Sequence, residues 1–185
     1  MRNHTTHSVL PASVLPASKL FQIGSLLTAF LAAFVFTVAA QAKLKEGDAF
    51  PPLKVVAFPG KPAVPAAKFN GRVVIVDFWA SWCEPCKVEL PALNKIHQKY
   101  KGKLVVIGVN VDENLNDAKT FLKDHPVGFD LVHDKGQKNA GELGIEKMPT
   151  SFILANGKII KLHEAFRAGD EKKMDAEVKK LLSGG

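Results

Sequence analysis

Two long apolar stretches stand out in the pattern of hydrophobic and polar positions. Arg72–Trp79 (RVVIVDFW) and Lys103–Asp112 (KLVVIGVNVD) are nearly continuous runs of β-branched and other apolar residues. A strand that is covered on both faces has this pattern, because neither face presents a regular row of polar side chains to water. We therefore expect two buried strands in a parallel or mixed sheet. Residues 129–134 (FDLVHD) form a weaker strand candidate, and residues 53–58 are compatible with an edge strand.

A helical pattern begins shortly after the first predicted strand. Within residues 87–100, apolar side chains recur at the spacing of one helix face. Pro91 lies inside this segment, and we expect a kink there because proline lacks a backbone N–H donor. The apolar positions are Val88, Leu90, Leu93 and Ile96.

The remaining pattern predicts short helices, a hairpin and a final helix. Asn156-Gly157 separates two apolar runs within residues 150–166, and this residue pair supplies the positive φ values of a two-residue turn. Residues 171–182 are amphipathic, with Asp170 as the expected N-cap and lysines near the end. Short helices are expected over residues 116–123 and over residues 137–143, the latter closed by Gly144.

These elements predict the α/β class. A strand, a helix and a second strand, followed later by a hairpin and a helix, are typical of one sheet flanked by helices. The chain has 185 residues, of which 46% are hydrophobic, so it is long enough to bury one substantial core. We expect a single globular domain over residues 43–185.

The first 42 residues have a different composition. Leu20–Ala40 contains no charged residue, and Ala40 and Ala42 have the small-x-small spacing that signal peptidase accepts. The first acidic residue of the chain is Glu46. We interpret residues 1–42 as an export signal, with a retained membrane anchor as the alternative, because roughly 20 apolar residues can span a bilayer. Either alternative places the domain in the periplasm or otherwise outside the cytoplasm.

Charge gives little indication of a nucleic-acid partner. The whole chain carries 25 Lys and Arg against 18 Asp and Glu, and Arg2 and Lys19 are the only charged residues of the first 42. The basic residues are spread through the sequence in short runs, and no basic stripe alternates with aromatic residues. We therefore expect a solvated surface and no binding to nucleic acid.

Chemical reactivity is concentrated at the only two cysteines, Cys83 and Cys86. They follow the first predicted strand and open the predicted helix, where free backbone N–H groups and the helix dipole stabilise a thiolate at Cys83. Cys86 is expected one turn deeper, within disulfide distance and shielded from solvent. One sulfur would attack and the other would resolve the mixed disulfide, which is thiol-disulfide exchange. Glu84 opposes the dipole and limits the fall in the thiol pKa.

Two other interpretations of the pair are weaker. A structural disulfide would close almost no loop between residues three apart, so it would contribute little to stability. A zinc site would need further ligands, and the chain has no other cysteine and no histidine at metal-ligand spacing. We therefore expect neither a metal nor any other cofactor. The histidines after the leader are His97, His125, His133 and His163.

The motifs resemble a known family. VDFWASWCEPC looks like the active-site segment of thioredoxin, and this segment together with MPTSFIL and the Asn-Gly hairpin resembles the exported TlpA/ResA group of thioredoxin-like proteins. The resemblance covers about residues 47–182. It implies the thioredoxin fold, a central mixed β-sheet flanked by helices, with an extra strand-helix insertion near residues 114–131.

The resemblance also implies a substrate-binding surface. A cis peptide before Pro149 would turn the backbone of Met148 toward Cys83 and form a rail for an extended substrate. An ordinary trans proline is the alternative. Trp82 beside Cys83 is expected to be a partly exposed contact residue, with Glu84 and Pro85 in the same surface, whereas Trp79 is expected in the core.

Two carboxyl groups complete the expected site. Asp77 precedes Cys83 by six residues, as an Asp does in thioredoxin. At the end of a buried strand its pKa should be raised, so that it could take the proton of Cys86; a solvated strand-end Asp is the alternative. Many TlpA-like proteins have Asn here, which leaves this role open. Glu89 matches a Glu of ResA-like reductases and could tune the thiols or contact substrate, or be a plain surface residue.

We expect an exported enzyme that reduces protein disulfides, acts as a monomer, and is recharged by a membrane electron donor because its compartment is oxidising. Apocytochrome c, and so cytochrome c maturation, is a candidate substrate by resemblance. A disulfide oxidant or isomerase is the nearest alternative, and a redox-inactive binding module or metallochaperone is the alternative of another class. A peroxidase is disfavoured, because peroxiredoxin-type enzymes have Thr three residues before the reactive Cys, where this chain has Ala80.

Overall fold

The computed structural model describes residues 43–70 and 73–184. The expected export signal of residues 1–42 lies outside the described residues. Within the described part, no helix combines the length and the apolar character needed to cross a membrane.

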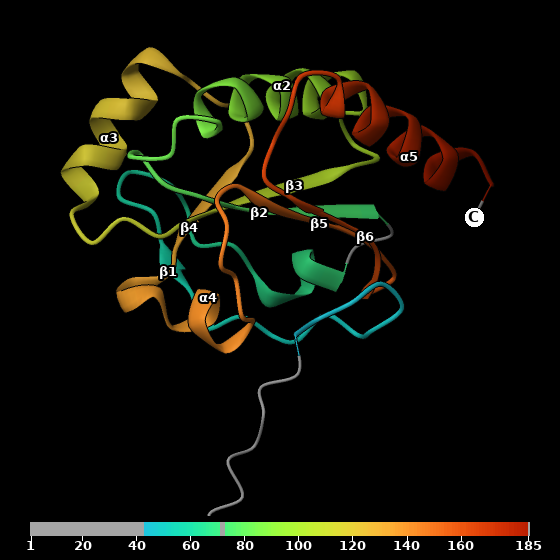
Figure 1. Ribbon diagram of the computed structural model, residues 1–185, viewed down its shortest axis with the longest axis horizontal. Coiled ribbons are helices and arrows are strands. Elements are labelled where there is room, and N and C mark those ends of the chain that lie inside the picture. The colour runs from blue at the N-terminus through green and yellow to red at the C-terminus, as the bar shows by residue number, and fades with distance from the viewer. Residues whose placement is uncertain (1–42, 71–72, 185) are drawn as a thin grey trace, which may run out of the picture. The chain divides into compact units, whose positions relative to one another are not determined.

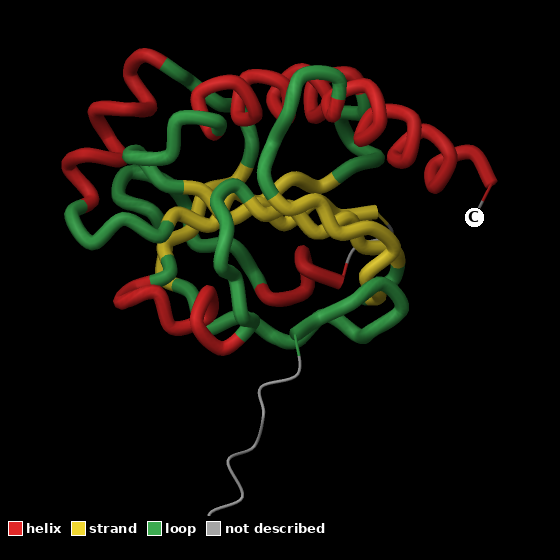
Figure 2. The backbone as a smooth tube through the Cα atoms, in the orientation of Figure 1, coloured by secondary structure: helices red, strands yellow, loops and turns green. Residues whose placement is uncertain are grey.

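Six strands form one mixed sheet in the order β1-β4-β3-β2-β5-β6 (Figures 1 and 2). The central strands run parallel to one another, and β5 and β6 add an antiparallel hairpin on one side. On the other side β4 is parallel to β3, and β1 pairs with β4 in antiparallel sense. The strands are β1 (Val56–Ala57), β2 (Val73–Trp79), β3 (Val105–Asn110), β4 (Asp130–His133), β5 (Thr150–Ala155) and β6 (Lys158–Glu164).

Helices cover both faces of this sheet. Figure 1 shows α2 and α5 along one face, and the short elements η1 and α4 on the opposite face. The α/β class and the flanked mixed sheet are therefore confirmed. The helices are η1 (Ala66–Asn70), α2 (Cys86–Lys99), α3 (Leu115–Asp124), η2 (Lys135–Gln137), α4 (Lys138–Glu142) and α5 (Asp170–Gly184).

Both apolar runs form the interior strands that their pattern predicts. Every residue of β2 is buried, and β3 is buried over all but its first residue. Trp79 at the end of β2 is in the core, where its ring lies 5.4 Å from that of Phe121 and 6.5 Å from that of Phe58. Gly108 permits this packing, because a Cβ at this position would lie 3.1 Å from the Trp79 Nε1 atom and 2.9 Å from a methyl carbon of Leu131.

The insertion is a helix followed by a strand. Along the chain, α3 and β4 follow β3 and precede the segment that leads to the β5-β6 hairpin. Their residue ranges are close to the predicted insertion of residues 114–131. The Asn114 side chain caps α3 by accepting the Asn116 N–H at 3.0 Å. β4 lies between β3 and the edge strand β1. β1 has two residues and is therefore shorter than the edge strand predicted over residues 53–58.

Two predicted helix starts differ from the structure. α2 begins at Cys86, so Cys83 lies in the preceding turn and not in the first helical turn. At α5 the Gly169 carbonyl accepts the first helical N–H groups, from Lys172 and Lys173. The Asp170 carboxylate faces backward and accepts the Arg167 N–H at 2.8 Å. Asp170 is therefore the first residue of the helix and not its N-cap.

Candidate active site

Cys83 and Cys86 form a disulfide, with sulfurs 2.05 Å apart and Cα atoms 5.3 Å apart. Cys86 is fully buried in the first turn of α2, and Cys83 is 3% exposed. The Cys86 N–H points at the Cys83 sulfur at 3.3 Å. A donor at this distance would stabilise a thiolate on Cys83 once the bond is reduced. The stabilising amide is therefore the first backbone N–H of α2, and it acts on a sulfur in the turn that precedes the helix.

Hydrogen bonds to the Asp112 carboxylate hold the turn that carries Cys83 in place. This buried carboxylate accepts the Ser81 N–H at 2.9 Å and the Ser81 hydroxyl at 2.8 Å. It also accepts the Asn110 amide at 2.6 Å. Because β2 and β3 are parallel, their carboxyl ends meet at one edge of the sheet, and Asp112 follows β3 as Ser81 follows β2. Asp112 therefore fixes the backbone two residues before Cys83.

Two exposed apolar side chains lie within two residues of the disulfide along the chain. Trp82 is 65% exposed and Val88 is 63% exposed, which is unusual for residues of this size. Glu84 is exposed, and its carboxylate pairs with the Lys87 ammonium at 2.6 Å. The structure thus places Trp82, Glu84 and Pro85 on the surface next to Cys83. That they bind substrate remains a prediction.

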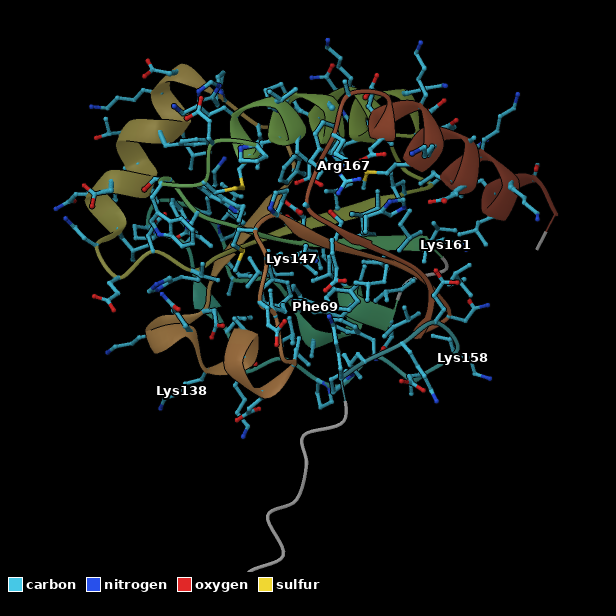
Figure 3. All side chains as sticks on the ribbon, viewed as in Figure 1. Phe69, Lys138, Lys147, Lys158, Lys161 and Arg167 are labelled. Atoms are coloured by element: carbon cyan, nitrogen blue, oxygen red, sulfur yellow. A yellow bond between two sulfur atoms is a disulfide. The ribbon has the colours of Figure 1, made fainter. Side chains whose placement is uncertain are left out.

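The Met148–Pro149 peptide is cis, as the resemblance implied. β5 begins at Thr150, which pairs with Phe78, so this peptide lies beside the end of β2 from which the Cys83 turn departs. The Thr150 hydroxyl donates to the Lys147 carbonyl at 2.7 Å, and the Ala165 N–H donates to the Pro149 carbonyl at 2.8 Å. Figure 3 shows Arg167 in the connection between β6 and α5, on the side of the sheet where α2 lies.

Asp77 and Glu89 meet in the core, and one serine hydroxyl lies between them. The Ser151 Oγ is 2.7 Å from the Asp77 Oδ1 and 3.0 Å from the Glu89 Oε1. All three residues are buried. The other carboxyl oxygens, Asp77 Oδ2 and Glu89 Oε2, have no hydrogen-bond partner among the described residues.

Burial changes the acidity of both groups. Desolvation raises the pKa of Asp77 to about 7, and the Ser151 and Glu89 hydrogen bonds oppose part of this rise. Desolvation also raises the pKa of Glu89 well above its usual range, and repulsion from Asp77 adds to the effect. The alternatives of a solvated Asp77 and of a plain surface Glu89 are therefore wrong.

Ser151 and Asp112 were not identified from the sequence. Ser151 lies in an otherwise apolar strand, TSFILA, where one small polar residue gives little signal without its partners. Asp112 could have been found, because an Asp directly after a buried parallel strand lies at the same sheet edge as the end of the neighbouring strand. Within residues 43–70 and 73–184, no cluster of three or more His, Cys, Asp or Glu side chains could hold a metal ion.

Proteins with similar sequences have names that agree with this geometry, since they are called thiol-disulfide oxidoreductase or thioredoxin-like protein. The AhpC/TSA family matches residues 47–163. Thiol-disulfide oxidoreductase ResA of Bacillus thuringiensis (strain Al Hakam) is 34% identical over 124 residues, which cover 66% of this chain and 71% of that protein. Thioredoxin-like protein YneN of Bacillus subtilis (strain 168) is 31% identical over 121 residues, which cover 63% of this chain and 69% of that protein.

A solved structure that is similar to this chain also belongs to a thiol:disulfide interchange protein. The crystal structure of a candidate thiol:disulfide interchange protein DsbE from Chlorobium tepidum superposes with a TM-score of 0.70 and is 33% identical. The similarity covers 76% of this chain and all of that one.

Proposed function

Because the chain belongs to the AhpC/TSA family of thioredoxin-like proteins and is a thiol-disulfide oxidoreductase, we propose that it works as a reductase of protein disulfides outside the cytoplasm. The observation that carries this proposal is the Cys83–Cys86 disulfide. Cys86 is fully buried, and Glu89, which has a buried carboxyl group, follows it three residues later in α2.

The proposed reaction begins with the reduced enzyme. The Cys83 thiolate attacks one sulfur of a substrate disulfide, a mixed disulfide forms, and the other substrate sulfur leaves as a thiolate. The Cys86 thiol then loses its proton to a nearby carboxylate, Asp77 or Glu89, and attacks the Cys83 sulfur. The second substrate sulfur leaves, and Cys83–Cys86 forms. Two electrons have passed from the enzyme to the substrate.

The surface around Cys83 suits a polypeptide substrate. Trp82 and Val88 offer exposed apolar contact area, and the Met148–Pro149 backbone directly precedes Thr150, which pairs with Phe78 near the end of β2. An extended substrate segment could pair with that backbone while its cysteine reaches Cys83. The residues proposed for substrate contact are Trp82, Glu84, Pro85, Met148 and Pro149.

The roles of the two cysteines can be tested by trapping. We expect Cys86→Ser to accumulate a mixed disulfide with a disulfide-containing protein such as insulin, because Cys83 can attack but nothing resolves the product. The matched variant Cys83→Ser should trap nothing, since its remaining sulfur is buried. Equal trapping by both variants, or trapping only by Cys83→Ser, would reverse the assignment.

The direction of electron flow is tested by the reduction potential. The protein is equilibrated in glutathione or dithiothreitol buffers while the fluorescence of Trp79 and Trp82 is recorded. A value near that of thioredoxin, about −270 mV, is the expected result for a reductase. A value near −120 mV, as for DsbA, would instead make the protein an oxidant.

A reductase in an oxidising compartment needs a source of electrons, so we propose a membrane electron donor and, as substrate, apocytochrome c or another exported thiol protein. Alkylation of Cys83 in cells tests this. We expect Cys83 to be mostly reduced when the donor is present and to be oxidised when the electron supply is removed. A Cys83 that is oxidised in both conditions would contradict the proposal.

Ala80 argues against peroxidase chemistry. It occupies the position three residues before Cys83 where peroxiredoxin-type enzymes have Thr, and its buried methyl group can donate no hydrogen bond to a peroxide. We therefore expect hydrogen peroxide to be turned over far more slowly than insulin disulfides.

A further inference from the structure

Ser151 presents a single hydroxyl group to two buried carboxyl groups that come from different elements. Ser151 is on β5, Asp77 is its register partner on the neighbouring strand β2, and Glu89 reaches the same hydroxyl from α2. The two oxygen-oxygen distances, 2.7 Å and 3.0 Å, are both within hydrogen-bond range. The arrangement therefore makes two contacts through one side-chain oxygen.

The number of hydrogen atoms limits which charge states fit these contacts. A serine hydroxyl carries one hydrogen and can donate it to one acceptor at a time, while a charged carboxylate can only accept. If Asp77 and Glu89 were both charged, one of the two contacts would bring together two oxygens without a hydrogen between them. Both contacts are hydrogen bonds only when at least one carboxyl keeps its proton and donates it to Ser151. Loss of the second proton is favoured at Asp77, whose pKa is about 7.

We propose that Ser151 joins Asp77 and Glu89 into one unit that holds a single proton at neutral pH and passes it between the two carboxyl groups. In the transfer, the protonated Glu89 gives its hydrogen to the Ser151 oxygen while the Ser151 hydroxyl hydrogen moves to the Asp77 carboxylate. Ser151 ends with one hydrogen, as it began, and the proton has moved from α2 to β2. The reverse transfer restores the starting state.

This unit deepens the proposed function, because Glu89 follows Cys86 by one helical turn. When the Cys86 thiol is deprotonated, the unit in its singly protonated form has one carboxylate free to accept that proton. The hydroxyl lets either carboxyl take the proton, whichever of them is nearer the sulfur. Ser151 is thus a positioning residue, which acts through the two carboxyl groups and not on the substrate.

Other charged groups approach the unit from α5 and β6. Asp170, at the start of α5, raises the pKa of Glu89 further by repulsion. His163 is the register partner of Ser151 on β6, but its Nε2 is bound to the Glu177 carboxylate on α5 at 2.8 Å. On the far side of β2, the residue opposite Asp77 is Gly108, which carries no charge.

The first test titrates the carboxyl carbons of the oxidised protein by NMR, so it does not depend on any exchange activity. We expect Asp77 and Glu89 to titrate in two linked steps, with Asp77 losing its proton first. Asp77→Asn should lower the midpoint of Glu89 by about one pH unit or more, because it removes the charge that repels the Glu89 carboxylate. Glu89→Gln should not lower the midpoint of Asp77, because the protonated Glu89 favours the Asp77 carboxylate through a hydrogen bond. A Glu89 midpoint that does not move in Asp77→Asn would overturn the proposal, even if the protein is a reductase.

The second test removes the hydroxyl group. Ser151→Ala takes away the donor that stabilises the singly charged unit, so the lower midpoint should rise by about half a pH unit or more. The acid limb of the pH profile for insulin reduction should rise with it. Ser151→Thr keeps a hydroxyl, and we expect it to restore both midpoint and profile toward the parent values. Asp134→Asn, which alters a buried carboxyl that caps α4, should leave the Asp77 and Glu89 midpoints unchanged.

The possible outcomes distinguish a failure of the shared-proton unit from a failure of the proposed reductase function. Shifted midpoints with no insulin reduction would leave the proton unit intact and remove the reductase assignment. Normal insulin reduction with a Ser151→Ala profile that superimposes on the parent would remove the proton unit and leave the reductase. A rise in Ser151→Ala that Ser151→Thr does not reverse, with both variants folded, would assign the effect to packing and overturn the role of the hydroxyl.

Discussion

At the scale of single residues, the core beneath the disulfide holds carboxyl groups whose charged forms are costly. Asp77 and Glu89 are both buried, and each keeps one oxygen without a partner among the described residues. A buried and incompletely bonded carboxylate is unfavourable by several kcal/mol on general grounds. Side chains of this kind are typical of sites where chemistry, and not stability, determines the residue.

Asp77→Asn should therefore stabilise the oxidised protein, and more so at higher pH. The folded-state pKa of Asp77 is raised from 3.8 to about 7, so folding favours the protonated form. Its contribution to stability is fully present below the unfolded-state pKa and is lost as pH rises through the folded-state value. We expect little difference between variant and parent at about pH 4, and a gain of about 2–4 kcal/mol at about pH 8.

Urea unfolding of the oxidised protein across this pH range measures the difference. A gain that is constant with pH would mean that the charge of Asp77 is not responsible.

Asp112 has the opposite balance, because its carboxylate is well bonded. Asp112→Ala leaves the Ser81 N–H and the Asn110 amide without their acceptor, so we expect a loss of about 2–4 kcal/mol in the free energy of unfolding. Asp112→Asn keeps one carbonyl oxygen and should lose less. The rate of insulin reduction should fall in both variants, because the turn before Cys83 is no longer fixed. Chemical denaturation and the insulin assay would measure these two effects.

Sequence reasoning at this scale identified residues with strong chemical signatures. The cysteine pair, the cis Pro149 and the burial of Asp77 were predicted, and the structure has all three. Ser151 was missed because its importance comes from Asp77 and Glu89, which are 74 and 62 residues away along the chain. Contacts of that separation exist only after the sheet and α2 have been assembled.

At the scale of secondary-structure elements, hydrophobic periodicity predicted which elements form, and local hydrogen bonds determine where they begin. The strands β2 and β3 and the β5-β6 hairpin match their predicted positions. α2 and α5 start at different residues from those expected, because Pro85 and Gly169 occupy the capping positions. The predicted kink at Pro91 stays a prediction, although Pro91 does lie inside α2.

The hairpin turn offers a test at this scale. Gly157 has a φ of 76°, and a Cβ at this position would lie 3.2 Å from the Asn70 side-chain oxygen. We expect Gly157→Ala to cost about 1–2 kcal/mol, from the left-handed conformation with an addition from crowding. Gly102→Ala is the matched control, because Gly102 has a φ of 80° but open space around it.

Urea midpoints of the two variants would separate the contributions. A Gly157→Ala protein no less stable than Gly102→Ala would show that Asn70 moves aside without cost.

At the scale of the whole molecule, the fold class followed from the pattern, but the order of the strands did not. Two buried runs indicate a parallel or mixed sheet without showing which strand lies in the centre. The resemblance to thioredoxin-like proteins implied a central mixed sheet flanked by helices, and the mixed six-stranded sheet confirms that much. The place of β4 between β3 and β1 depends on pairings that no local pattern encodes.

The global stability of the two redox states tests the direction of electron flow independently. The disulfide closes a loop between residues three apart, so its entropic contribution is small, about 2 kcal/mol. For a reductase we expect the oxidised form to be the more stable by about this amount. A more stable reduced form is the property of a strong oxidant such as DsbA. Unfolding curves in matched oxidising and reducing buffers, with the double variant Cys83→Ser/Cys86→Ser as control, would show which applies.

The two outer strands of the sheet also bear on how the molecule behaves at high concentration. β1 has only two residues, and the outer edge of β6 is partly covered by residues 47–49, which precede β1 along the chain. The Gly47 N–H donates to the Ile159 carbonyl, the Ile159 N–H donates to the Asp48 carbonyl, and Ala49 pairs with Lys158. Uncovered strand edges are templates on which another chain can add a strand. The first few residues of the folded domain thus guard against fibre-like aggregation, and a shortened protein that begins after Phe50 would be prone to it.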